Sequence, residues 1–227
     1  MTKRTLLACT AAICAAFTLP AAAAPVTGLS LLIDESGSIS NSNFILQNNG
    51  YINALTTVLP ADGSVALEVK TFGTTVNTLF PLQTITAATK AVLLAALAAN
   101  TKSGGNTATG PAIQQAQADL LGFAGLTRRI IDVSTDGFGN VGISETTAAQ
   151  AAVAAGINQV NVLCIGGSAN CAFNQGTGSF NVAATFATFE STLTTKLQRE
   201  LQVPEPLSLA VLGTGLLGLG LFRRRAA

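Results

Sequence analysis

Histidine and tryptophan are both absent from the 227-residue sequence, which also holds a single tyrosine. The lack of histidine excludes Ser-His-Asp and Cys-His nucleophilic sites, histidine-ligated zinc and imidazole acid–base catalysis. The scarcity of Trp and Tyr argues against the aromatic surfaces of many carbohydrate and single-stranded nucleic-acid binders. The chemistry of this chain must therefore come from its acids, hydroxyls and backbone groups.

The two ends of the chain have the composition of processing segments. Residues 1–23 combine Lys3 and Arg4 with an apolar run that ends in a small-residue cleavage context, which predicts an export signal. Near the other end, Pro204-Glu205-Pro206 precedes the mostly apolar residues 207–222 and three terminal arginines. That apolar run is slightly short for a membrane span, and the arginines would hold its cytoplasmic side. A buried core helix is the alternative, and the arginines argue against it.

Residues 203–227 closely resemble the PEP-CTERM sorting signal of Gram-negative bacteria. The resemblance implies export, a transient inner-membrane anchor formed by a transmembrane helix, and removal of that helix by an exosortase. It also implies release, or transfer to the cell surface and the exopolysaccharide matrix of a biofilm. We therefore expect a signal peptide at 1–23, one folded domain at 24–202 and a sorting signal at 203–227.

The expected mature domain is mildly acidic. Removal of both end segments leaves seven basic residues against ten acids, so residues 24–202 carry a net charge of about −3 with no basic run. Nucleic acid is therefore not an expected partner.

Within residues 24–202, apolar strand-like runs alternate with segments of helical periodicity, a pattern typical of an α/β fold. We expect strands near 27–33, 64–72, 76–80, 130–134 and 159–165, and helices near 44–59, 87–99, 107–120, 144–155 and 184–201. The predicted architecture is a doubly wound, mostly parallel central sheet flanked by helices. With strand order 3-2-1-4-5-6, the first and fourth strands would be neighbours, and a crevice would open at their carboxyl ends.

Acids and hydroxyls follow these two strands. The first strand ends in Asp34-Glu35-Ser36-Gly37-Ser38, and the fourth in Thr135-Asp136-Gly137. Thr107 opens the helix that precedes the fourth strand, so its hydroxyl can reach the same crevice. Carboxylate and hydroxyl oxygens suit Mg²⁺ or a similar hard cation.

This constellation resembles the metal-ion-dependent adhesion site, or MIDAS, of von Willebrand factor A (vWA) domains, which have a Rossmann-like fold. The resemblance implies a Mg²⁺ ion, or Mn²⁺ or Ca²⁺ in its place, with an open position for an anionic oxygen of a partner. Carried over residue by residue, it assigns five ligands: Asp34, Ser36, Ser38, Thr107 and Asp136. Gly50-Tyr51, residues 128–134 and Gly178-Ser179-Phe180 further resemble an uncharacterised group of exported bacterial members.

Two alternatives concern this crevice. Thr109 could be the ligand in place of Thr107, which would then cap the helix; the Thr-x-Thr-Gly alignment favours Thr107. Residues 137–142 also match Gly-x-Gly-x-x-Gly, a dinucleotide-binding pattern. That fingerprint needs an acid about twenty residues later, and no acid lies between Glu145 and Glu190. We therefore expect a flexible rim to the metal crevice at 137–142.

Four further residues carry weaker expectations. Cys164 and Cys171 are expected to form a disulfide in an oxidising periplasm, worth roughly 2–3 kcal/mol; two independent buried thiols are the alternative. Glu35 is expected to point to solvent, where it would favour cation retention. Asp132, inside a strand, is expected to pair with Arg128 or Arg129.

The sequence thus predicts an exported, non-enzymatic adhesion protein. Its cation would hold an acidic group of an extracellular protein or acidic polysaccharide at the cell surface or in the matrix. A structural matrix protein with a merely stabilising ion is the second hypothesis. A metal-assisted hydrolase is the third, and it lacks an evident general base or second metal.

Overall fold

A computed structural model of the protein describes residues 26–166 and 171–202. The expected signal peptide and sorting signal lie outside these residues. Within the described part, no helix is both long enough and apolar enough to cross a membrane.

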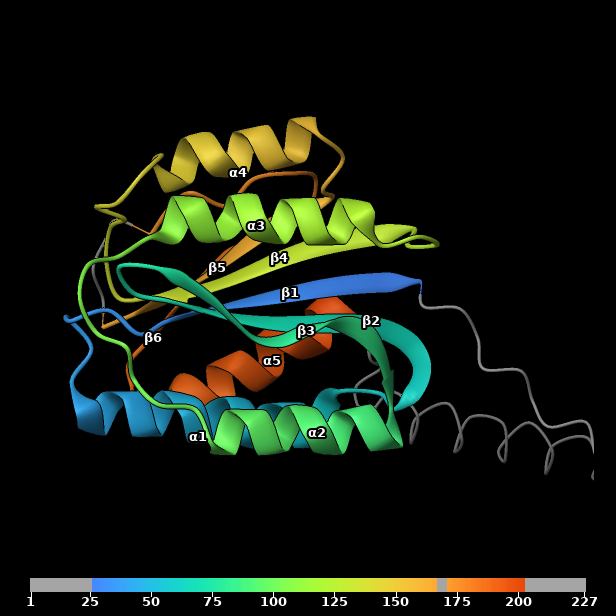
Figure 1. Ribbon diagram of the computed structural model, residues 1–227, viewed down its shortest axis with the longest axis horizontal. Coiled ribbons are helices and arrows are strands. Elements are labelled where there is room, and N and C mark those ends of the chain that lie inside the picture. The colour runs from blue at the N-terminus through green and yellow to red at the C-terminus, as the bar shows by residue number, and fades with distance from the viewer. Residues whose placement is uncertain (1–25, 167–170, 203–227) are drawn as a thin grey trace, which may run out of the picture.

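The described chain forms one six-stranded sheet with helices on both faces (Figure 1). The strands are β1 (Thr27–Asp34), β2 (Asp62–Phe72), β3 (Val76–Thr86), β4 (Arg128–Thr135), β5 (Gln159–Ile165) and β6 (Asn181–Ala184). The helices are α1 (Asn41–Val58), α2 (Ala87–Ala98), α3 (Thr109–Gly122), α4 (Glu145–Ala154) and α5 (Phe189–Leu201). The strand order is β3-β2-β1-β4-β5-β6, and only β3 runs antiparallel to its neighbour. The expectation of a doubly wound, mostly parallel sheet is confirmed.

Each face of the sheet packs against its own set of helices. Alternation along β1 directs Leu29, Leu31 and Ile33 into one core, shared with α1, α2 and α5, while Leu32 enters a second core shared with α3 and α4. In Figure 1, α3 and α4 accordingly lie on one side of the sheet and α1, α2 and α5 on the other. The central strands are therefore buried on both sides, which explains their nearly continuous apolar sequence.

Two predicted boundaries were wrong at the two edges of the sheet. The expected short strand at 76–80 continues to Thr86. It passes through Pro81, which an edge strand tolerates because one side of its backbone lies free of the ladder. The helix expected from residue 184 begins at Phe189. The residues before it form β6, a four-residue strand too short to produce a clear alternating pattern.

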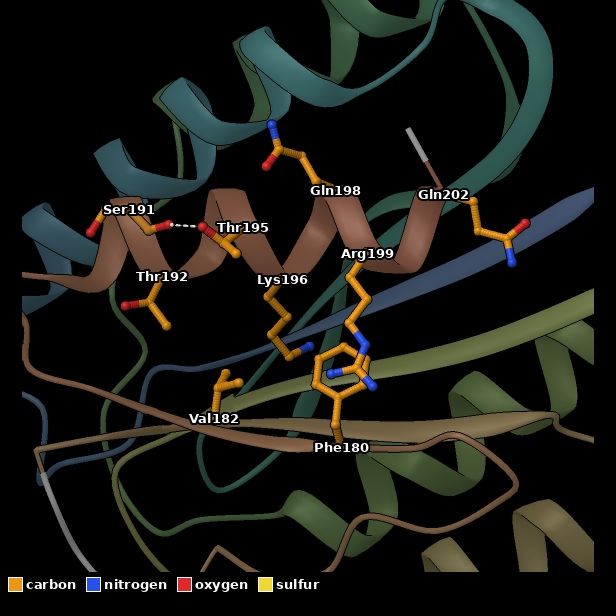
Figure 2. A pocket seen from close by; sticks show the side chains of 9 residues that line it. All are labelled: Phe180, Val182, Ser191, Thr192, Thr195, Lys196, Gln198, Arg199 and Gln202. Carbon is orange, nitrogen blue, oxygen red and sulfur yellow. Dashed lines mark hydrogen bonds between the residues drawn. The ribbon is translucent and has the colours of Figure 1, made fainter. Parts of the chain in front are cut away.

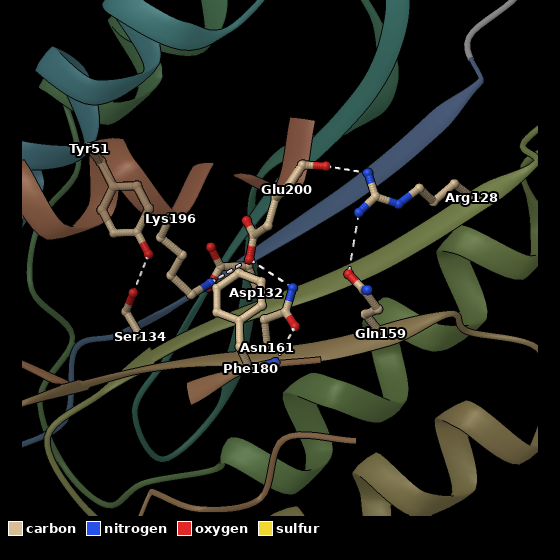
Figure 3. A network of polar contacts seen from close by, with 9 residues as sticks. All are labelled: Tyr51, Arg128, Asp132, Ser134, Gln159, Asn161, Phe180, Lys196 and Glu200. Atoms are coloured by element: carbon tan, nitrogen blue, oxygen red, sulfur yellow. Dashed lines mark hydrogen bonds and ion pairs between the residues drawn. The ribbon is translucent and has the colours of Figure 1, made fainter. Parts of the chain in front are cut away.

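The prediction that Asp132 pairs with Arg128 or Arg129 was wrong. Asp132 instead forms an ion pair with Lys196 of α5, and both side chains are fully buried. Lys196 also pairs with Glu200 at 2.6 Å. Figure 3 shows these three charged groups between β4 and α5, with Asn161 donating to Glu200 at 2.9 Å. The two arginines instead donate to backbone carbonyls, Arg128 to that of Glu200 and Arg129 to that of Leu120.

The Cys164–Cys171 disulfide is present and joins the end of β5 to the segment that precedes β6. Cys171 is almost fully buried, and its Sγ lies 3.9 Å from the carbonyl oxygen of Thr135. The bridge therefore packs against the end of β4.

Candidate metal site

Three loops gather at the carboxyl end of the sheet, at the left of Figure 1: the β1–α1 loop, the α2–α3 loop and the β4–α4 loop. The parallel pairing of β1 with β4 sets Ile33 opposite Ser134, so Asp34 and Thr135 end neighbouring strands. These two strands are central, as their apolar sequence predicted. Their position determines where the site lies.

A chain of hydrogen-bond contacts joins four of the five predicted ligands. The Ser36 N–H donates to Asp34 Oδ1 at 2.8 Å, and the Ser36 and Ser38 hydroxyls lie 3.0 Å apart. The Ser38 hydroxyl then donates to Asp136 Oδ1 at 2.7 Å. Asp34, Ser36, Ser38 and Asp136 therefore form one contiguous oxygen-rich cluster, although they come from two loops about a hundred residues apart.

Asp34 is the buried centre of this cluster. Its side chain is inaccessible to solvent, and within the described residues it makes no ion pair with a lysine or arginine. Burial raises the pKa of Asp34 to about 6, with the nearby negative charge of Asp136 adding to the effect and hydrogen bonds from Ser36 and Thr135 opposing it. A buried carboxylate close to a second acid lacks a counter-charge, which a cation would supply.

Thr107, the fifth predicted ligand, lies on the neighbouring α2–α3 loop. Its backbone N–H donates to Asn140 Oδ1 at 2.8 Å, and its carbonyl accepts from the Asn140 N–H at 2.9 Å. These bonds tie Thr107 to the loop that follows Asp136. No hydrogen bond among the described residues joins the Thr107 hydroxyl directly to the other four ligands.

Thr107 and Thr109 differ in burial and in their relation to the start of α3. The N-cap of α3 is Ala108, and no side chain caps this helix, so Thr107 does not act as a cap. Thr109 is fully buried, and its hydroxyl has no hydrogen-bond partner among the described residues. Thr107 is 7% exposed, which leaves its side chain nearer to the open side of the site.

The prediction that Glu35 points to solvent was wrong. Glu35 is 1% exposed, and its carboxylate accepts from the Asn100 amide at 2.7 Å and from the Ser103 N–H at 3.3 Å. Its carbonyl accepts from the Gly104 N–H at 3.0 Å. Glu35 thus holds the α2–α3 loop against the β1–α1 loop, a role that sequence spacing gave no sign of.

A close backbone contact also places the α2–α3 loop against the end of β2. A Cβ on Gly73 would lie 2.2 Å from the carbonyl oxygen of Gly104, so only glycine fits at position 73. The Gly73 carbonyl also accepts from the Ala108 N–H at 2.9 Å. The start of α3 is therefore fixed relative to the strand ends.

Two residues that sequence reasoning left without a role support the cluster. Thr135 donates from Oγ1 to Asp34 Oδ2 at 2.7 Å, and Gln47 of α1 donates to the Asp34 carbonyl at 3.1 Å. Thr135 follows the predicted pattern of a hydroxyl and an acid at a strand end, which was the available signal. Gln47 had none, because a glutamine on a helix face is usually exposed.

The donor set fits a hard divalent cation rather than a soft one. Within residues 26–166 and 171–202, no group of three or more Cys, Asp or Glu side chains is placed to hold a metal ion. A cation here would depend on two carboxylates, hydroxyl oxygens and water, which is the chemistry of Mg²⁺, Mn²⁺ or Ca²⁺ sites.

Solved structures with this fold are vWA-type domains and related proteins. Proximal thread matrix protein 1 from the mussel byssus matches 76% of this chain with a TM-score of 0.60 and 18% identity; the same protein has also been solved with a zinc-occupied MIDAS motif. The pilus adhesin SpaC from Lactobacillus rhamnosus GG matches 78% (TM-score 0.62, 17% identity). A von Willebrand factor type A structure from Catenulispora acidiphila matches 78% (TM-score 0.59, 13% identity).

The present chain spans less than half of each of these three proteins: 47%, 30% and 43% of their lengths, respectively. At these identities the similarity establishes the fold alone. No curated protein sequence matches the chain. One protein family, described as "Protein of unknown function (DUF1194)", matches residues 26–205, which include every described strand and helix. The described part of the chain has a vWA-type fold. The chain belongs to the DUF1194 family.

Proposed function

We propose that this chain is an exported binding protein that holds a divalent cation and uses it to bind an acidic group of a macromolecular partner. The proposed ligands are Asp34, Ser36, Ser38, Thr107 and Asp136. The observation that carries the proposal is the buried Asp34 carboxylate. A chain of hydrogen-bond contacts connects it to a second acid, and no cationic side chain among the described residues forms an ion pair with it.

Mg²⁺ is the proposed ion, with Mn²⁺ and Ca²⁺ as substitutes, because the donors are all oxygens. When bound, the ion would supply a positive attachment point for an anionic oxygen of the partner. Asp34 and Asp136 would balance its charge, while the serine and threonine hydroxyls would orient it. Mg²⁺ usually keeps part of its water shell, so a partner carboxylate can replace a water.

The surroundings of the site suit a binding role. Phe138 is 54% exposed and lies two residues beyond Asp136, on the rim formed by residues 137–142. An exposed aromatic beside a charged attachment point is a common feature of protein interfaces.

Among the described residues, two further acids lie near the site: Glu35, which accepts hydrogen bonds from Asn100 and Ser103, and Glu145, whose carboxylate lies beside the Gly139 backbone. The proposal assigns neither of them a catalytic role.

The proposed route places this site outside the cell. Residues 1–23 would direct export, residues 24–202 would form the binding domain, and residues 203–227 would anchor the protein in the inner membrane until an exosortase removes the helix. The end product would lie at the cell surface or in the extracellular matrix. The mussel matrix protein and the pilus adhesin that share the fold are consistent with such a location.

A pull-down tests this function. The purified full-length chain is mixed with envelope and matrix material of the producing cell in magnesium or in chelator, beside Asp34→Ala and the charge-matched control Asp62→Ala. Asp62 is exposed and begins β2, at the opposite end of the sheet from Asp34. We expect retention in magnesium by wild type and Asp62→Ala, and none by Asp34→Ala or in chelator. Equal retention of Asp34→Ala in magnesium would refute the proposal.

The same samples separate binding from a merely structural ion. A structural ion would raise the melting temperature of the wild-type protein. In that case, chelator would leave the retention of the protein unchanged. The proposed function requires chelator to remove retention at temperatures where the chain stays folded.

A further inference from the structure

The sheet has two edge strands, β3 and β6. The surface around β6 has the features of a peptide-binding site. The last strand in the sheet order is β6, so one side of its backbone faces away from the ladder. A cavity of about 740 Å³ lies between β6 and α5. That volume is in the range of sites that hold small ligands or peptide side chains, roughly 300–1,000 Å³. We call this space the α5–β6 cavity.

The backbone pattern of β6 determines which groups are available. The Val162 and Gly166 N–H groups donate to the carbonyls of Phe180 and Ala184, so alternate residues of β6 direct their backbone toward β5. The intervening residues, Asn181 and Ala183, direct theirs to the outer side. Both are exposed, and the structure gives these outer backbone groups no partner among the described residues.

The two edges of the sheet are protected differently. Natural proteins guard edge strands with proline or with charged side chains. The edge strand β3 contains Pro81, whereas β6 has the sequence Asn-Val-Ala-Ala with neither. The short length of β6 limits self-association, but nothing in its sequence prevents another strand from pairing with it.

The wall of the cavity is apolar at β6 and carries one guanidinium at α5. Figure 2 shows Arg199 and Lys196 pointing from α5 toward Phe180 and Val182. The Arg199 guanidinium lies over the Phe180 ring, 4.0 Å from its centroid. The Phe180 backbone is itself fixed, because its N–H donates to Asn161 Oδ1 at 3.1 Å. Stacking on an anchored ring holds the guanidinium in place before any ligand arrives.

Arg199 is the free positive charge of this cavity. Among the described residues it makes no ion pair and no side-chain hydrogen bond. Lys196 cannot serve, because its Nζ is buried and paired with Asp132 and Glu200. A single guanidinium matches one carboxylate in bidentate geometry, whereas phosphate recognition usually draws on a cluster of arginines.

We propose that β6 and α5 form a docking site for an extended acidic segment of a partner protein, which adds to the sheet beside β6 and places a carboxylate on Arg199. Main-chain hydrogen bonds to Asn181 and Ala183 would supply affinity, and the cavity would select an acidic side chain flanked by apolar ones. This site is independent of the cation site, which lies at the ends of β1 and β4.

The test uses the full-length chain in chelator, so that the cation site cannot contribute. The probe is a fluorescent hexapeptide that alternates valine with polar residues and carries a central glutamate. It is compared with the same peptide carrying glutamine, and with a version N-methylated on the pairing side. Anisotropy should show the glutamate peptide binding about tenfold to a hundredfold more tightly than the glutamine peptide, and the N-methylated peptide not binding.

Variants of the protein separate the two halves of the proposal. Arg199→Gln should remove the preference for glutamate, while the charge-matched Lys102→Gln retains it. Ala183→Pro removes an outward N–H and no donor to β5, and an edge strand tolerates proline at such a position. It should abolish binding with an unchanged circular dichroism spectrum. Asp34→Ala should bind the peptide as the wild type does. The proposal is overturned if no peptide binds, if Ala183→Pro binds normally, or if free glutarate competes as well as the peptide, which would indicate a small-carboxylate pocket.

Discussion

The Thr135 hydroxyl donates a 2.7 Å hydrogen bond to Oδ2 of Asp34 and so joins the ends of two neighbouring strands. Asp34 Oδ1 accepts from the Ser36 N–H at the same time. Each oxygen of this buried carboxylate therefore has one donor that fixes its direction. Such supporting bonds determine how well a carboxylate is oriented toward a cation.

Thr135→Val tests this supporting role, because it keeps the shape of the side chain and removes the donor. We expect affinity for Mg²⁺ to fall by about tenfold to a hundredfold, as measured by titration calorimetry. Thr135→Ser should restore most of the affinity, since it retains the hydroxyl. Unchanged affinity in Thr135→Val would show that the bond does not orient the carboxylate.

The roles proposed for Thr107 and Thr109 lead to opposite predictions for cation binding and for stability. Thr107→Val should weaken cation binding, because it removes a proposed ligand at the open side of the site. Thr109→Val replaces a buried hydroxyl that has no partner among the described residues. It should leave cation binding unchanged and should raise the free energy of unfolding by about 1 kcal/mol. Calorimetry and urea denaturation measure the two effects, and the reverse outcome would assign the ligand to Thr109.

The buried group of Asp132, Lys196 and Glu200 predicts a contrast between two substitutions. Burial alone would lower the pKa of Lys196, but the two acids outweigh it and raise that pKa. Lys196→Met leaves two acids buried without their cation and should cost about 3–5 kcal/mol. Urea denaturation at pH 7 measures this loss.

Glu200→Gln is the matched control for that experiment. Burial and the nearby Asp132 raise the pKa of Glu200, which favours its neutral form. A glutamine Oε1 can accept from Lys196 and Asn161 as Glu200 Oε1 does. We therefore expect a change within about 1 kcal/mol. Equal destabilisation by both substitutions would contradict this description of the cluster.

Glu68 predicts a dependence of stability on pH. Burial raises the pKa of Glu68 from 4.5 to about 7, with Ser30 and Lys70 opposing the effect and Asp119 adding to it. Below pH 4.5 the group is protonated in both the folded and the unfolded chain. Between pH 4.5 and 7 the unfolded chain releases its proton first, so the stability associated with neutral Glu68 is lost as the pH rises.

Glu68→Gln should remove this loss. Its free energy of unfolding relative to wild type should increase by up to about 3 kcal/mol between pH 4.5 and 8. Urea denaturation at several pH values measures it, with the exposed Glu190→Gln as control. Parallel profiles for wild type and Glu68→Gln would contradict the expectation.

The architecture could be predicted from the sequence because its signals are strong and local. Nearly continuous apolar runs such as residues 29–33 indicate central parallel strands, and the acids that follow them indicate their carboxyl ends. The adjacency of Asp34 and Thr135 then follows from the winding of the sheet. The short spacing and the predicted export favoured a disulfide between Cys164 and Cys171, and the structure confirms it.

The errors concern contacts set by the tertiary structure. Glu35 has an ordinary surface residue's sequence context, and only the approach of the α2–α3 loop buries it. Asp132 was assigned to arginines nearby in sequence, whereas its partner Lys196 lies on the last helix. Strand β6 is too short for an alternating pattern, and it forms because β5 offers it a free edge. Such features depend on packing between distant segments, which no local pattern encodes.

The most direct test of the central claim is a calorimetric titration of MgCl₂ into the full-length chain, beside Asp34→Ala and the control Asp62→Ala. We predict saturable binding of one ion per chain for wild type and Asp62→Ala, and no binding for Asp34→Ala with an unchanged circular dichroism spectrum. Identical binding curves for wild type and Asp34→Ala, or no saturable binding of Mg²⁺, Mn²⁺ or Ca²⁺ to the wild type, would contradict it.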